Sequence, residues 1–194
     1  MNPARRRAQG QAQRILHSRP IYLDTETTGL GPEAEIVEIA VLDTDGSLLF
    51  ESLVRSSSPI PPDATQVHGI TTAMVAQAAD WRGVWPEVAP ILADRPIAIY
   101  NAEFDQRMIR QAHRRASLAW EVPSSQFTCL MELYAEFRGD WNPMKGSYRW
   151  HSLDVASRHC ALPLTNNHRA GQDAQLARLL LEYMAQPPAN SPGS

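Results

Sequence analysis

Two acidic residues near the start of the sequence have the type and spacing of a metal site. Asp24 and Glu26 lie two residues apart at the end of an apolar run, residues 21–24, that is typical of a short buried strand. Because side chains in a strand alternate between its two faces, both carboxylates project from the same face. Two carboxylates held together repel each other unless a proton or a divalent cation neutralises them, and Mg²⁺ and Mn²⁺ prefer such oxygen ligands. The alternative is a pair of solvated acids at a strand end.

Three more residues extend this pattern. Asp105 is in the first turn of an expected helix, where its ordinary role would be a favourable interaction with the helix N-terminus worth about 0.3–1 kcal/mol. Asp173 lies one turn into the last expected helix, and His168 precedes it by five residues, at a junction where a histidine is more often a cap or a surface residue. Taken together, four carboxylates and one histidine predict a two-metal phosphodiesterase site, in which the histidine removes a proton from the attacking water.

The motifs that hold these residues resemble, in order and spacing, those of the DEDDh family of 3′→5′ exonucleases. The best-known type of that family is the proofreading epsilon subunit of bacterial DNA polymerase III. The motifs are YLDTETTG at residues 22–29, YNAEFD at residues 100–105 and HRAGQD at residues 168–173, with lesser family marks in EIA at 38–40, VHGIT at 67–71 and WHSL at 150–153. The resemblance covers residues 20–185.

This resemblance implies an RNase H-like fold with two bound Mg²⁺ or Mn²⁺ ions and a histidine general base. The implied ligands are Asp24, Glu26, Asp105 and Asp173, and the implied base is His168, whose spacing from Asp173 is that of the histidine branch of the family. The resemblance also implies a pocket for the terminal nucleotide, lined by Thr27, Gly29, Leu30, His68, Asn101 and Phe104. Ordinary structural roles are credible for these six as well: a turn glycine, a helix cap and packed aromatic rings. Such an enzyme would accept a free 3′ end, with single-stranded DNA or a frayed duplex favoured and RNA possible, and release nucleoside 5′-monophosphates.

The elements that must position these residues follow from changes in hydrophobic period along the chain. Strands are expected at residues 21–24, 36–42 and 48–54, the last two joined by a turn at Asp45-Gly46, and this succession predicts an antiparallel meander. Further strands are expected at residues 96–100 and near Phe127, and helices over residues 72–79, 84–93, 102–115, 130–137, 152–160 and 170–185, with Asn101 a candidate cap for the third. Residues 56–62 and 138–149 are expected to be loops. The order predicts an α/β fold in which helices flank a mixed sheet, built from the three-strand meander and parallel strands.

The charge is divided unevenly along the chain. The sequence has 194 residues, with 18 Lys and Arg against 21 Asp and Glu, a formal net charge of −3 that on its own argues against a nucleic-acid partner. Residues 1–19 contain five arginines and no acid, which leaves 13 bases against 21 acids in the remainder. We therefore predict a flexible basic arm at residues 1–19, an exonuclease domain at residues 20–185 and a disordered tail at residues 186–194. Because the excess acids include the four candidate ligands, net charge is a poor guide to the partner.

Several protein classes are excluded by composition. No apolar run approaches the roughly 18 residues that a membrane helix needs, and the amino-terminus lacks the apolar segment of a secretory signal, so we expect a cytoplasmic protein without a membrane partner. Cys129 and Cys160 lack metal-ligand spacing and are expected to be ordinary reduced thiols. The oligomeric state is left open.

Alternatives to a DNA exonuclease also remain at this point. The matching motifs do not distinguish DNA from short or structured RNA as substrate. A non-catalytic protein docked on a polymerase is disfavoured because no catalytic position is lost, and a stable polymerase complex is not expected because the chain ends about ten residues after its last expected helix. A phosphatase with Asp24 as nucleophile would want a lysine near the phosphate, and the only lysine, Lys145, is in a loop. That loop, residues 140–150, combines aromatic and basic residues either as a groove for a single strand or as simple packing.

Overall fold

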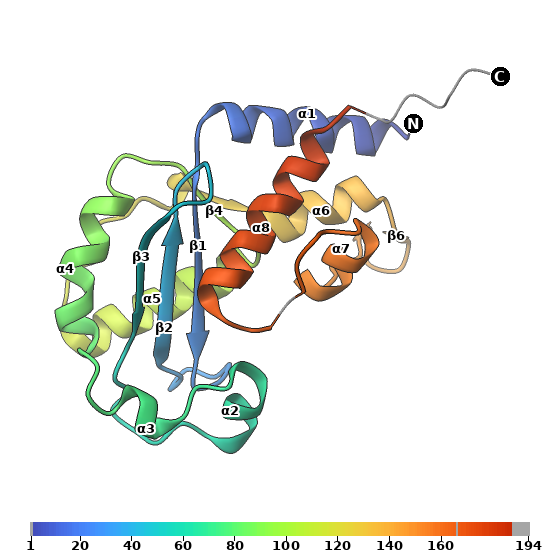
Figure 1. Ribbon diagram of the computed structural model, residues 1–194. Coiled ribbons are helices and arrows are strands. Elements are labelled where there is room, and N and C mark those ends of the chain that lie inside the picture. The colour runs from blue at the N-terminus through green and yellow to red at the C-terminus, as the bar shows by residue number, and fades with distance from the viewer. Residues whose placement is uncertain (1, 166, 188–194) are drawn as a thin grey trace.

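A five-stranded mixed sheet forms the centre of the structure, a computed structural model that describes residues 2–165 and 167–187 (Figure 1). Its strands are β1 (Ile21–Thr27), β2 (Ile36–Leu42), β3 (Leu48–Leu53), β4 (Ile97–Ile99) and β5 (Phe127–Cys129). They lie in the order β3-β2-β1-β4-β5. The first three pair antiparallel, whereas β4 pairs parallel with both β1 and β5. The predicted α/β class, with a meander joined to parallel strands, is confirmed.

Helices cover both faces of this sheet, and the alternation of side chains along β1 explains why. Tyr22 packs in a core with helices α6 (Leu130–Arg138), α7 (Leu153–His159) and α8 (Ala170–Ala185). Ile21 and Leu23 point the other way, into a second core formed with α4 (Trp81–Leu92) and α5 (Ala102–Ala116). All seven residues of β2 are buried, because helices cover it on both sides.

Shorter elements account for most departures from the predicted helices and loops. The expected loop after β3 is followed by a helix that was not predicted, α2 (Pro62–His68), and the helix expected over residues 72–79 is reduced to α3 (Thr72–Val75). A 3₁₀ turn, Ser124–Gln126, precedes β5. The loop expected over residues 138–149 contains a small hairpin of β6 (Trp141–Asn142) and β7 (Ser147–Tyr148). Its turn includes Gly146 at φ 60°, a left-handed conformation that glycine adopts without strain.

The prediction of a flexible arm at residues 1–19 is wrong for most of that segment. Residues Pro3–His17 form helix α1, which lies against α6 and α8 (Figure 1). Ala4, Ala8 and Ala12, spaced one turn apart, are completely or almost completely buried. Small side chains at this spacing let one helix approach another closely, so α1 packs without the large apolar residues by which an amphipathic helix is usually identified.

The carboxyl-terminal helix matches its prediction at both ends, Ala170 and Ala185. The predicted disordered tail, residues 186–194, falls mainly on residues 188–194, which lie outside the described residues. None of the helices in the described part of the chain combines the length and the apolar composition that crossing a bilayer requires.

Candidate active site

The first two acids lie within β1, which runs three residues further than predicted. Asp24 and Glu26 are on the face of the strand that carries Tyr22, toward α8, and both are partly exposed. In the antiparallel register, Asp24 is opposite Ala40 and Glu26 is opposite Glu38 of β2. The sheet therefore holds three carboxylates on neighbouring positions of one face.

Asp105 reaches the same place from α5, which begins directly after the parallel strand β4. Its side chain is only 3% exposed and accepts a hydrogen bond of 2.7 Å from the hydroxyl of Thr25. Thr25 lies between the two acids of β1, so this bond ties the first turn of α5 to the middle of the acidic strand segment. Asn101 occupies the N-cap position of α5, but its side chain is exposed and makes no capping hydrogen bond, contrary to its predicted structural role.

The third motif contributes from the start of α8. The ring of His168 is 47% exposed, and its Nδ1 lies 3.9 Å from Oδ2 of Asp173, which is buried. His168 has a left-handed backbone, φ 54°, which is uncommon for a residue with a side chain. One ligand atom from each of Glu26, His168 and Asp173 falls within 4.8 Å of the others, a spacing suited to a shared metal ion.

The charges of these acids act on one another. Burial raises the pKa of Asp24 well above its usual value, and the negative charges of Asp105, Asp173 and Glu26 raise it further. Burial, with Asp173 and Glu38, raises the pKa of Glu26 to about 8. Burial also raises the pKa of Asp105, against the opposing effect of the Thr25 hydrogen bond. Acids with pKa values raised in this way need protons or cations to neutralise their charge. Their carboxylate oxygens are the ligands that hard divalent ions prefer.

An ion pair between the buried Glu38 and the half-buried Arg169, which the sequence did not assign to the site, fixes the junction before α8. Glu38, 1% exposed, accepts hydrogen bonds from Nε of Arg169 at 3.0 and 3.1 Å and from its Nη2, and also from the backbone N–H of Ala170 at 2.9 Å. Because Arg169 follows His168 in the chain, this contact fixes the position of His168 relative to the sheet. The sequence feature that could have identified Glu38 is its place inside the apolar run of residues 36–42, where a charge is stable only if it is paired.

The residues expected to line a nucleotide pocket lie around the end of β1. Buried His68 accepts a hydrogen bond at Nδ1 from the N–H of Ile70 (3.0 Å), so its Nε2 donates to the carbonyl of Thr27 (3.2 Å). Burial lowers the pKa of His68 and favours this neutral ring. The hydroxyl of Thr27 donates to the carbonyl of Gly29 at 2.8 Å. These contacts give His68 and Thr27 a structural role in holding the turn, whatever the turn binds.

Two apolar side chains stand beside that turn. Leu30 is 77% exposed, which is unusual for a large apolar residue and leaves it open to a ligand. Phe104, in the first turn of α5, is partly buried, and the guanidinium of Arg107 lies 5.3 Å from its ring centre. The same arginine donates to the carbonyl of Leu30 at 3.1 Å, so α5 holds the turn from its other side.

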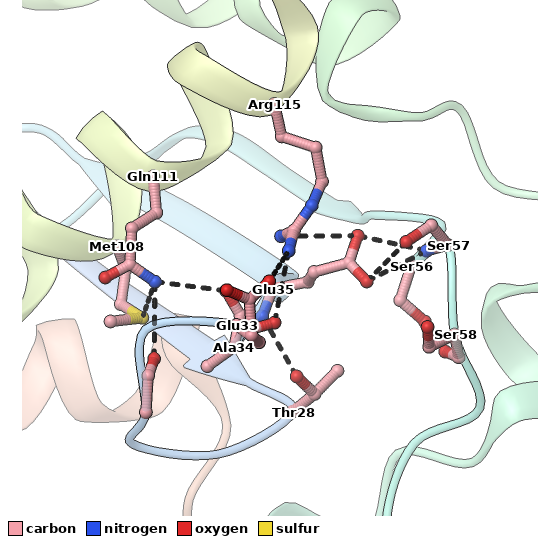
Figure 2. Close-up of polar contacts among 11 residues, drawn as sticks. Thr28, Glu33, Ala34, Glu35, Ser56, Ser57, Ser58, Met108, Gln111 and Arg115 are labelled. Carbon is pink, nitrogen blue, oxygen red and sulfur yellow. Dashed lines mark hydrogen bonds and ion pairs between the residues drawn. The ribbon is translucent and has the colours of Figure 1, made fainter.

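The rest of the loop between β1 and β2 is fixed by polar contacts, as Figure 2 shows. Gln111 of α5 donates to the carbonyls of Gly31 and Ala34, both at 3.3 Å. Arg115 binds the carboxylate of Glu33 at 3.0 Å, and Glu35 accepts hydrogen bonds from the backbone and hydroxyl of Ser57. These contacts fix the loop that contains Leu30 to α5 on one side and to the segment after β3 on the other.

Comparisons with known proteins agree with this geometry. The exonuclease family model RNase_T matches residues 21–181. An uncharacterised exonuclease of Escherichia phage 186 is 36% identical over 181 residues, which cover 91% of this chain and 93% of the phage protein. A PolC-type DNA polymerase III of Thermotoga maritima is 29% identical over 84% of this chain, but the chain spans only 12% of that polymerase.

Solved structures give the same result for the fold. The structure of Exonuclease X in complex with 5′ overhanging duplex DNA superposes with a TM-score of 0.62 at 29% identity, covering 84% of this chain and 90% of that one. The predicted RNase H-like arrangement is thereby confirmed. With a family model that matches most of its length, the chain belongs to the RNase_T exonuclease family and is an exonuclease acting on nucleic acid.

Proposed function

We propose that the protein is a metal-dependent 3′→5′ exonuclease that removes nucleoside 5′-monophosphates from DNA. The observation that carries the proposal is that Glu26 of β1 and Asp173 of α8 meet beside the exposed ring of His168, with Asp24 and Asp105 near enough for their charges to act on the same acids. The ligands of two Mg²⁺ or Mn²⁺ ions would be Asp24, Glu26, Asp105 and Asp173. When bound, these ions would supply the Lewis acidity that polarises the scissile phosphate.

The residues of the chain supply the remaining chemistry. Nδ1 of His168 lies on the side of Asp173, 3.9 Å from its Oδ2, so Nε2 would be the nitrogen that accepts the proton of the attacking water. The exposure of the ring allows it to approach a water bound next to the acids. Leu30, Phe104 and Asn101 would hold the terminal nucleotide in line for attack, with His68 and Thr27 supporting the turn behind it.

DNA is favoured as the substrate because of the relatives that share sequence as well as fold. Exonuclease X, at 29% identity, was solved with duplex DNA, and the PolC-type relative is a DNA polymerase. The alternative is a 3′→5′ exoribonuclease acting on short or structured RNA. The proposal includes a cytoplasmic enzyme that forms no stable polymerase complex. A purely non-catalytic role is disfavoured because all four acids and the histidine are present, and ligand atoms of Glu26, His168 and Asp173 lie within 4.8 Å of one another.

The test is a side-by-side degradation assay with a 5′-labelled single-stranded DNA, a mismatched DNA primer end and a short RNA. With Mg²⁺ or Mn²⁺ we expect a descending ladder on DNA that disappears with EDTA and in Asp173→Ala. A matched control is Asp154→Ala, which removes a partly exposed acid from the first turn of α7, where it pairs with Arg158. A label released at once as a mononucleotide would show the opposite polarity, and no ladder on any substrate would refute the proposal.

A further inference from the structure

The β6–β7 hairpin, residues 140–150, exposes large apolar side chains at one end of the molecule. Trp141 is 51% exposed, Trp150 is 60% exposed and Met144, in the turn, is 96% exposed. Tyr148, partly buried, meets the ring of Trp141 edge to face at 5.1 Å between ring centres, which holds Trp141 upright. The two tryptophans therefore do not fill the interior of an irregular connection, which was the structural alternative for this segment.

Basic groups lie among these aromatic rings. Lys145 is exposed in the turn of the hairpin. Arg149 is 54% exposed, with its Nε 3.5 Å from a carboxylate oxygen of Asp140, and its backbone N–H donates to the carbonyl of Asp140 at 2.8 Å. Asp140, which also lies 3.6 Å from Nε2 of His151, thus closes the hairpin and offsets part of its positive charge. Aromatic faces combined with cations are the means by which proteins bind single-stranded nucleic acid.

Trp150 connects the hairpin to the start of α5, because it lines two cavities. One, of about 490 Å³, lies over the hairpin and includes Lys145, Tyr148 and Arg149. The other, of about 290 Å³, extends to Asn101, the N-cap residue of the helix that carries Asp105, and includes Arg110 together with two acids, Glu103 and Glu132. Trp150 is therefore the shared wall between the end of β4 and the hairpin surface.

A buried hydrogen bond holds this wall in place. The hydroxyl of Tyr100, the residue after β4, donates to the carbonyl of His151 at 2.7 Å. Tyr100 is 6% exposed, and His151 is next to Trp150 in the chain. The position of the tryptophan is thus set from the same strand end that sets Asn101.

We propose that the hairpin and Trp150 bind the single-stranded stretch of nucleic acid immediately 5′ of the nucleotide being removed. This inference rests on the proposed exonuclease function and extends it to the choice of substrate. Bases stack on Trp150 and then on Trp141, while Lys145 and Arg110 attract the phosphates between them. Because a base inside a duplex has no free face for stacking, the surface favours a single strand or a frayed end over paired DNA.

The test compares a long with a short substrate in variants of the tryptophans. For Trp150→Ala and Trp141→Ala we expect the KM for a 12-nucleotide single strand to rise roughly 5- to 100-fold, the loss of one or more stacked bases. In Trp141→Ala the advantage of the 12-mer over a dinucleotide should fall by the same factor, because the one upstream base of a dinucleotide can reach Trp150 but not Trp141. Trp150→Phe keeps an aromatic face and should restore most of the affinity for the 12-mer that Trp150→Ala loses.

Binding without turnover provides an independent readout. Fluorescence anisotropy with a labelled 12-mer in Ca²⁺ should show the same weakening, and Lys145→Gln should lower the slope of log affinity against log salt by about 0.7. Leu48→Ala, which truncates an apolar residue that is 57% exposed on β3, is the matched control and should change neither quantity. Each variant should keep the circular dichroism spectrum and Tm of the native protein.

Failure of this inference is distinguishable from failure of the proposed function. If the native protein releases nucleotides and both alanine variants keep the native KM on the 12-mer, the hairpin does not bind the strand. In Trp141→Ala an equal loss on the dinucleotide and on the 12-mer would also overturn it, since it would indicate a disturbed active site. If no nucleotide is released from any substrate, the proposed function fails, and the anisotropy measurement still decides whether the hairpin binds a single strand.

Discussion

Glu26 and Glu38 are opposite each other on β1 and β2, yet their surroundings differ in charge. Glu38 has its counter-charge within the chain, because Arg169 and the N–H of Ala170 bind both of its oxygens. Glu26 has mainly negative neighbours, and the nearby Arg169 offsets only part of their effect. Burial, together with these negative charges, raises its pKa to about 8.

The difference between the two glutamates distinguishes a structural carboxylate from one that can bind a cation. A buried carboxylate with a full set of donors in the chain holds elements together, and here it holds α8 on the sheet. A carboxylate whose charge the chain does not balance must be completed by something outside the chain, which favours a cation at Glu26. The two residues therefore predict opposite consequences for the same chemical change.

Replacement of Glu26 by glutamine should have the largest effect on activity. The amide keeps the shape but loses the anionic oxygen, so we expect a fall in nucleotide release of about 10³-fold, equivalent to several kcal/mol of transition-state stabilisation. The metal-free variant should nevertheless be more resistant to urea than the native protein at pH 8, because a repulsive charge has been removed. The rate of mononucleotide release and a urea titration in EDTA measure the two effects.

Glu38→Gln is the matched control for that experiment. This variant makes the same glutamate-to-glutamine change at the residue opposite Glu26, but it breaks an ion pair. It should therefore lower the free energy of unfolding rather than raise it. If both variants lose stability to the same extent, the distinction between a balanced and an unbalanced carboxylate is wrong.

Replacement of Arg169 by glutamine should have the largest effect on folding. It leaves the buried Glu38 with only the N–H of Ala170 as a donor; such a loss costs about 3–5 kcal/mol in fully buried pairs and less here, because the side chain of Arg169 is 40% exposed. Urea denaturation should show this loss, with activity reduced further because the junction that carries His168 is no longer held. Arg158→Gln is the control, since Arg158 and Asp154 form an i,i+4 pair with side chains 67% and 40% exposed, worth about 0.3–0.5 kcal/mol.

The double variant Glu38→Gln/Arg169→Gln extends the test. With both charges absent, no buried carboxylate is left unpaired, so a large part of the stability lost in Arg169→Gln should return. A double variant no more stable than Arg169→Gln would show that the arginine acts through packing rather than through its charge.

The same distinction explains how much could be predicted from the sequence. The five strands of the central sheet and the helix Ala170–Ala185 followed from hydrophobic period, and the type and order of the acids indicated that the first and third motifs, whose Glu26, His168 and Asp173 lie together, could meet. The role of Glu38 did not, because its partner is 131 residues away and only the fold brings them together. Local spacing indicates which acids can share a face, but not which of them the chain itself neutralises.

Helix α1 shows a second limit of sequence reasoning. Its arginines suggested a mobile arm, whereas its packing depends on alanines, which carry little hydrophobic signal individually. The arginines themselves take part in the packing: the guanidinium of Arg5 lies 4.2 Å from the ring centre of Phe137, and Arg7 pairs with Glu136 at 2.9 Å. Charge composition was therefore a poor guide to order in this segment.

The smallest of the predicted effects is a dependence of stability on pH and metal that arises from the unbalanced acids. The pKa of Glu26 rises from a usual value of 4.5 to about 8 in the folded protein. Between these values the metal-free folded state keeps a proton that the unfolded state releases, so its stability should fall as pH rises from about 5 to 8. The pKa of Asp24, which is also raised above its usual value, likewise makes the stability fall as pH rises.

Bound cations should reverse this trend, because they bind the ionised acids and replace the protons. Mn²⁺ at about 100 times its Kd stabilises the folded state by about 2.7 kcal/mol, which corresponds to a rise in Tm of roughly 5–10 °C for a chain of this size. Thermal unfolding scans in EDTA and in Mn²⁺ at pH 5.5 and pH 8 measure this rise in Tm, which should be larger at pH 8. In Glu26→Gln the gain should shrink at both pH values, while in Arg158→Gln it should match that of the native protein. A gain that is independent of pH would mean that the metal does not displace protons from these acids, and that the charge of Glu26 is balanced in some other way.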